Sequence, residues 1–217
     1  MQNIKNILIG FLVSFIGSIP LGYLNVVGYD VFKKFGLNET VFYLLGVISI
    51  EFFVIYFTLL FANQLIANKK LLKFIEGFSV FFMFVLAFIF YTSASSETTN
   101  PSVLERYVQY SPFVAGLILS SLNFIQVPFW TSWNLYLLNG NYIEISKSRK
   151  YFYVFGTVLG TFSGMLVLIF SLNYLTLEFE FFKLFLFQFI IPLVFVALGI
   201  FQAVSFCKKY QLFKKNN

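Results

Sequence analysis

The chain has 217 residues, of which 59% are hydrophobic and only 11% are charged. Its mean hydropathy of +0.83 and its 33 phenylalanines exclude a water-soluble domain, because a soluble core of this length has no room for so many apolar side chains. The formal net charge of +6 lies in short clusters between apolar runs, which indicates membrane topology signals and not a nucleic-acid-binding surface. The composition therefore predicts an integral membrane protein whose main surroundings are a lipid bilayer.

Six apolar stretches are long enough to cross a bilayer, which takes about 20 residues per helix. In chain order they are approximately Ile7 to Val31, Thr40 to Ala62, Leu72 to Thr92, Pro112 to Leu138, Tyr153 to Leu175 and Phe181 to Phe206. Polar connections separate them and leave no room for a soluble domain. The sequence thus predicts a single all-α transmembrane domain over residues 1–217, with six helices in two halves of three, at about 1–95 and 110–217.

Lysine and arginine are enriched in cytoplasmic loops, so their distribution predicts the orientation of the spans. With six spans both chain ends lie on one side of the membrane. The opposite side carries only Lys33, Lys34, Arg106 and Lys183, and the other basic residues fall on the side of the termini. We therefore expect a multi-pass protein with both termini in the cytoplasm.

The first and fourth predicted spans each carry a proline and several polar residues inside the apolar run. The first reads G-S-I-P-L-G-Y-L-N from Gly17 to Asn25, and the fourth reads S-S-L-N-F-I-Q-V-P-F-W-T-S-W-N from Ser120 to Asn134. Pro20 and Pro128 each remove a backbone donor, so we expect each helix to kink or break there. A packing kink explains either proline alone. Two breaks at matching positions favour inverted repeats with a site near the membrane midplane, as in many secondary transporters, where broken helix ends would suit a zwitterion.

Glu51 lies in the middle of the second predicted span. A charged side chain at the centre of a membrane helix costs about 2.5 to 3.5 kcal/mol on insertion scales, so it usually faces a cavity or a partner. Glu51 can bind a substrate ammonium group, carry a coupling proton, or join a buried polar network; we favour a functional role. The run from Gly46 to Glu51 matches in position the run from Gly156 to Thr161, so Glu51 is expected to face Thr161.

The remaining polar and small residues of the spans have a structural and a functional interpretation. Asparagine and glutamine side chains on the broken helices can hydrogen-bond to one another or to a ligand. An ion pair with the neighbouring lysines explains Asp30 adequately. The small-residue stripe of the fifth span favours close helix packing, either inside the bundle or in a homodimer. The residues concerned are Asn25, Asn123, Gln126 and Asn134 among the amides, Trp130 and Trp133 among the aromatics, and Gly156, Gly160 and Gly164 in the stripe.

Three of these segments resemble motifs of the LysE-type translocator family, the lysine and homoserine/threonine exporter group of bacteria. The run G-S-I-P-L-G-Y-L-N resembles the family's P-G-P-N near the start of its first helix, with Leu21 and Tyr23 at the glycine and second proline. The run ending at Glu51 resembles a G-x-x-x-G-D run, and Leu122 to Trp130 resembles L-N-P-x-x-x-x-F-W, with Phe124 at the proline. Length, span count and the arrangement in two halves agree over almost the whole chain.

The resemblance implies a proton-coupled exporter of amino acids or related small metabolites in the bacterial cytoplasmic membrane. The candidate residues for substrate binding and coupling are Glu51, Pro20, Gly22, Asn25, Asn123, Gln126, Pro128, Trp130 and Thr161. One alternative is a cation or metal-ion exporter, which the absence of histidine limits to oxygen ligands. Another is a non-transporting membrane scaffold, which would leave Glu51 unexplained.

We expect no enzymatic activity and no cofactor. The chain has no histidine and one cysteine, Cys207, so it lacks the commonest general base and the commonest ligand for zinc. Paired intramembrane carboxylates and a G-x-S-x-G motif are also missing from the sequence.

Overall fold

The computed structural model describes residues 2–18, 22–95, 111–178 and 190–210, and all regular secondary structure within them is helical. The helices are α1 (Gln2–Ser18), α2 (Tyr23–Phe35), α3 (Leu37–Ala67), α4 (Lys69–Ser95), α6 (Pro112–Leu122), α7 (Gln126–Asn139), α8 (Arg149–Glu178) and α10 (Ile191–Lys209). The predicted all-α class is confirmed. Pro20, most of the connection before Pro112 and the first part of the predicted sixth span lie outside the described residues.

Three helices are long and apolar enough to cross a membrane, through Leu37–Ala62 in α3, Arg149–Thr176 in α8 and Pro192–Lys209 in α10. Two bent pairs meet the same test when each is taken as one span: α1 with α2, bent by 79°, and α6 with α7, bent by 72°. The described residues thus hold three to five candidate membrane spans. Helix α4 covers the predicted third span but is not in this count, so the six-span arrangement stays a prediction.

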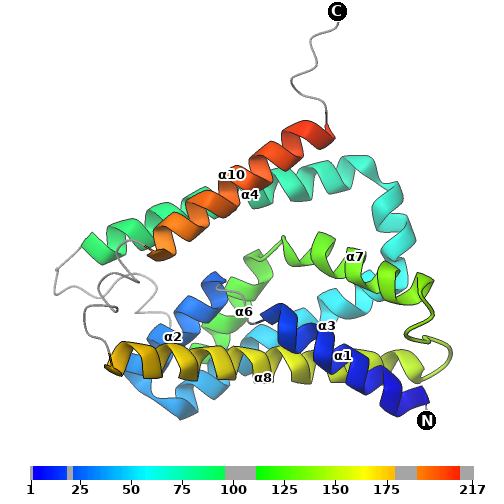
Figure 1. Ribbon diagram of the computed structural model, residues 1–217, viewed down its shortest axis with the longest axis horizontal. Helices are drawn as coiled ribbons and strands as arrows, with labels where there is room; N and C mark the ends of the chain where they lie inside the picture. Colours follow the sequence, from blue (N-terminus) through cyan, green and yellow to red (C-terminus); the bar gives the residue numbers. More distant parts are fainter. Residues whose placement is uncertain (1, 19–21, 96–110, 179–189, 211–217) are drawn as a thin grey trace, which may run out of the picture.

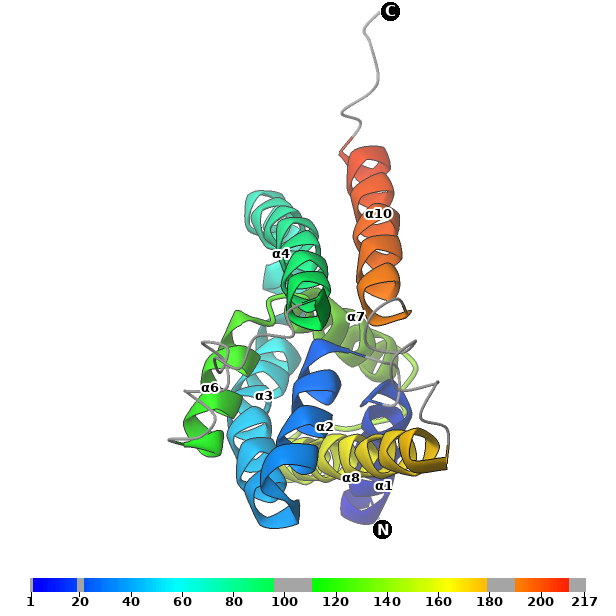
Figure 2. The same ribbon diagram turned by 90° about the vertical axis from the view of Figure 1, so that its left-hand side faces the viewer.

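The helices form a bundle and a separate pair (Figures 1 and 2). Helices α1, α2, α3, α6, α7 and α8 pack around one another, whereas α4 and α10 lie side by side next to the bundle and α10 packs mainly on α4. Lys209 and Glu76 form an ion pair of 2.5 Å between the two helices of the pair. Large apolar side chains on this pair are exposed, among them Phe81, Phe88 and Phe201, as expected for side chains that face lipid.

Glycines set the closest contacts of α1 with α8. A Cβ atom added at Gly156, Gly160 or Gly164 would overlap the backbone of α1. The interpretation of this stripe as a close-packing face is therefore confirmed. Because α1 covers the stripe within the bundle, this face is not available for a homodimer.

A second close contact joins α3 to α6. A Cβ atom at Gly46 on α3 would overlap the carbonyl oxygen of Phe113, and one at Gly116 on α6 would overlap the carbonyl oxygen of Tyr43. Each bent pair therefore has its first helix pressed against a long helix, α1 against α8 and α6 against α3. The glycines allow the backbones to approach because no side chain stands between them.

The break in the fourth predicted span comes before Pro128 and not at it. Helix α6 ends at Leu122, and α7 begins at Gln126, so Pro128 lies in the first turn of α7. Proline is tolerated in a first turn because the backbone donor that it lacks would have no helical partner there. In the first predicted span, the helix likewise ends at Ser18 and resumes at Tyr23.

Candidate functional site

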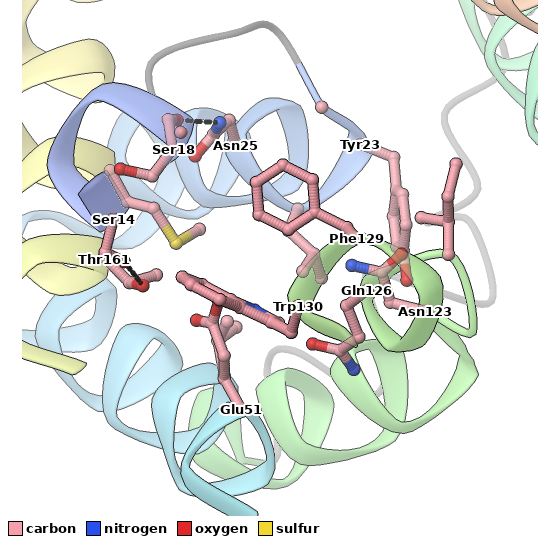
Figure 3. Close-up of a pocket in the computed structure, with 16 residues that line it drawn as sticks. Ser14, Ser18, Tyr23, Asn25, Glu51, Asn123, Gln126, Phe129, Trp130 and Thr161 are labelled. Atoms are coloured by element: carbon pink, nitrogen blue, oxygen red, sulfur yellow. Dashed lines mark hydrogen bonds between the residues drawn. The ribbon is translucent and has the colours of Figure 1, made fainter. Parts of the chain in front are cut away.

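A cavity of about 260 Å³ lies where the two bent pairs meet the long helices (Figure 3). Its walls come from α1, α2, α3, α7, α8 and the connection between α6 and α7. Helices α4 and α10 contribute no lining residue. The cavity is thus a feature of the bundle and of the two helix breaks.

Seven of the nine predicted site residues line this cavity. They are Gly22, Asn25, Glu51, Asn123, Gln126, Trp130 and Thr161. Pro128 does not line it, and Pro20 lies outside the described residues. Segments far apart in the sequence therefore converge on one site.

Glu51 points into the cavity from α3, and groups from two other helices surround its carboxylate (Figure 3). The indole Nε1–H of Trp130 donates to Oε1 of Glu51 at 3.2 Å. The hydroxyl of Thr161, on α8, lies beside the same carboxylate. The structure thus places Glu51 opposite Thr161, as the two matching sequence runs predict.

A hydroxyl contact extends this arrangement to α1. The Oγ of Ser14 and the Oγ1 of Thr161 are 2.5 Å apart, and both side chains are buried. Ser14, Thr161, Glu51 and Trp130 therefore connect α1, α8, α3 and α7 in that order. Ser14 was not among the predicted site residues, because a single serine in an apolar run does not by itself indicate a site. The stripe of small residues at Gly10, Ser14 and Gly17 was the available clue.

Two amides at the breaks bond to backbone carbonyls near the ends of α1 and α6. The Nδ2 of Asn25 donates to the carbonyl of Ser18 at 3.0 Å, and the Nε2 of Gln126 donates to the carbonyl of Ser120 at 2.9 Å. The last carbonyls of a helix have no intrahelical partner, and in a membrane they need one from the protein or from water. Each amide therefore stabilises a helix break while it lines the cavity.

Asn123 differs from these two amides. Its Oδ1 is buried, and no hydrogen-bond partner for it is found in the part of the chain that the structure describes. Unsatisfied buried acceptors are uncommon because they cost free energy. Asn123 thus has an amide oxygen that can accept a hydrogen bond from a ligand.

Other polar residues singled out in the sequence have structural partners. Asn134 donates through Nδ2 to Thr58 Oγ1 at 3.0 Å and accepts from the hydroxyl of Tyr153 at 2.8 Å. Asp30 pairs with Lys34 at 2.9 Å, as expected from their spacing. Trp133 lies away from the cavity and packs its ring against Tyr136. Asn134 thus joins α7 to α3 and α8, whereas Asp30 and Trp133 contact residues of their own helices; none of the three is in the lining.

Apolar side chains complete the walls, among them Val47, Phe129 and Met165, and Glu51 is the only charged residue in the lining that the structure describes. Within the described residues, no three His, Cys, Asp or Glu side chains are grouped as a metal site would need. The arrangement is a small apolar chamber with one carboxylate and several hydrogen-bonding groups. No known protein family, curated protein or solved structure gives a significant match to the chain.

Proposed function

We propose that this protein is a secondary transporter that exports amino acids or related small metabolites across the cytoplasmic membrane, coupled to the proton gradient. The observation that carries the proposal is the carboxylate of Glu51 in a cavity between two bent helix pairs. An ionisable residue inside a membrane bundle typically marks a substrate or proton pathway. One carboxylate can bind a proton and a cationic group in turn, which is the exchange that proton-coupled efflux requires.

The proposal includes six spans in two inverted halves of three. The matching glycine contacts support it: Gly10 on α1 lies against the carbonyl of Tyr153 on α8, and Gly116 on α6 lies against the carbonyl of Tyr43 on α3. Gly156, three residues after Tyr153, lies against α1 in return, and Gly46, three residues after Tyr43, lies against α6. The first span thus meets the fifth as the fourth meets the second, which is the relation expected of inverted repeats.

The same arrangement suggests how the cavity opens to either side. In inverted-repeat transporters, parts of the bundle rock against one another around a fixed site. Here Glu51 touches groups from α7 and α8, so loading a proton or a substrate changes contacts between different spans. Resemblance to LysE-type translocators adds amino acids as the first substrates to test.

The test is metabolite profiling of cells that are loaded with dipeptides and express the wild type or Glu51→Gln at matched membrane levels. The wild type should release one or a few amino acids faster than the variant. Glu144→Gln is the matched control, because Glu144 is exposed and outside the cavity; it should retain export. Identical profiles for the wild type and Glu51→Gln would contradict the proposal.

Orientation has its own test. In a Cys207→Ala background, a cysteine placed at Ser96 should react with a membrane-impermeant reagent applied from outside intact cells. If the cysteine reacts only when the reagent can reach the cytoplasmic face, the proposed topology with both termini in the cytoplasm is wrong.

A further inference from the structure

We propose that the cavity recognises the ammonium end of a small amine with an apolar body, and that it prefers such an amine to the amino acid of the same side chain. This inference rests on the proposed function and names the substrate class of its site. Three features of the lining carry it: the charge, the state of the hydrogen-bond donors, and the apolar walls.

The charge of the lining suits a cation. Glu51 supplies one carboxylate, and among the described residues no lysine or arginine lines the cavity to meet an anionic group. The indole of Trp130 lies beside that carboxylate, with its Nε1–H on Oε1. An ammonium group can pair with the carboxylate and lie near the aromatic ring.

Most side-chain donors in the described lining are already engaged within the protein; the Nδ2 of Asn123 is an exception. Asn25 and Gln126 donate to backbone carbonyls, Trp130 donates to Glu51, and the hydroxyls of Ser18 and Tyr23 donate to the carbonyls of Phe15 and Leu119. A buried carboxylate of a ligand would need such donors, since it cannot otherwise replace its hydration. The buried Oδ1 of Asn123, in contrast, is an acceptor that a ligand N–H can satisfy.

The start of α7 does not supply the missing donors. Backbone N–H groups of Gln126, Val127 and Phe129 donate to carbonyls of the preceding turn, and Pro128 has no N–H. At the start of α2, the backbone N–H groups of Asn25 and Val26 donate to the carbonyl of Gly22. We expect a preference for the amine and, because the Nδ2 of Asn123 is a donor, not complete rejection of the amino acid.

The walls indicate an apolar body for the ligand. Val47, Phe129 and Met165 line the cavity together with Glu51 and Asn123, and a volume of about 260 Å³ suits a branched or aromatic group. Phenethylamine, phenylalanine methyl ester, phenylalanine and 3-phenylpropionate form a matched series. They share a phenyl ring and differ in charge: cation, cation, zwitterion and anion.

Trp130 provides the readout. The chain has two tryptophans, and Trp133 lies outside the cavity, so the Trp133→Phe protein reports through Trp130 alone. Each compound is titrated into the full-length protein in lipid nanodiscs while the indole fluorescence is followed. We expect phenethylamine and the methyl ester to bind at least about tenfold more tightly than phenylalanine, because the unpaired buried carboxylate of phenylalanine costs more than about 1.4 kcal/mol. We expect 3-phenylpropionate to bind most weakly.

Glu51→Gln in the same background should weaken phenethylamine at least about tenfold. Phenylalanine binding as tight as phenethylamine, and dependent on Glu51, would overturn the amine preference and leave the transport proposal standing. Absence of any Glu51-dependent binding would overturn both. The ligand series itself needs no variant at the site, so a poorly folded Glu51→Gln protein leaves the preference testable.

Discussion

Alanine at Gly156 is expected to destabilise the protein, although alanine is the better helix former. In a helix interior alanine is favoured over glycine by about 1 kcal/mol. At Gly156, however, the added Cβ would overlap the carbonyl oxygen, Cα and carbonyl carbon of Ile7. These are backbone atoms, so no rotamer change relieves the overlap, and α1 must move away from α8.

The size of the effect follows from these two contributions. Overpacking a core costs about 1 to 3 kcal/mol, and a clash with backbone belongs at the upper end of that range. After the gain of about 1 kcal/mol in helix propensity, about 2 kcal/mol of net destabilisation remains. For a chain of this length that lowers Tm by about 4 to 8 °C.

Gly77→Ala is the matched control on α4. There the nearest atom to an added Cβ is a ring carbon of Phe206 at 3.6 Å, which is an ordinary contact. The propensity gain of about 1 kcal/mol should survive and raise Tm by about 2 to 4 °C. Thermal melting of both variants in detergent, followed by the loss of monodisperse protein on size-exclusion chromatography, compares the two directly. A Gly156→Ala protein that melts at or above Gly77→Ala would refute the packing of α1 on α8.

Three further predictions concern single side chains. Trp130→Phe keeps a ring in the cavity but removes the donor to Glu51, so the fold should lose about 1.5 to 3 kcal/mol, as for a lost hydrogen bond to a charged group, and Tm in detergent should fall. Asn134→Leu leaves buried partners on α3 and α8 unsatisfied; Tm should fall while the ranking of ligands stays the same. The hydroxyl of Ser146 and the guanidinium of Arg149 lower the pKa of Glu144, so this carboxylate stabilises the fold at neutral pH and loses that effect as pH falls through the lowered value. Glu144→Gln should therefore have a lower Tm than the wild type at neutral pH, and the two Tm values should be equal at a pH below the lowered pKa.

The helical spans were predictable because apolar length is a local property of the sequence. The predicted second and fifth spans lie inside α3 and α8, where long apolar runs leave little choice of structure. The residues at which α1 and α6 end were harder to predict. A proline indicates that a helix is disturbed nearby, but the break before Pro128 lies at the turn of residues 123–125. The position of that turn depends on which backbone N–H and carbonyl groups find hydrogen-bond partners.

The convergence of the candidate residues was predictable only in part. Glu51 stood out because its charge is costly in a membrane helix, and its match with Thr161 followed from two aligned runs. The roles of the amides were not readable, since Asn25, Gln126 and Asn134 differ from Asn123 only in the carbonyls and hydroxyls that the fold brings near them. Such partners come from distant segments, which no local pattern reports.

The contacts of α1 with α8 and of α6 with α3 are alike in backbone packing, but the side chains at the centre of α3 and α8 differ in chemistry. Glu51 and Thr161 occupy corresponding places after matching glycines, yet only one of them ionises. Two facing carboxylates would repel each other, whereas a threonine offers the single carboxylate a hydroxyl and passes the contact on to Ser14. The site therefore has one negative charge, and a proton or one ammonium group is sufficient to neutralise it. Under the proposed function, this asymmetry favours exchange of the two at the same carboxylate.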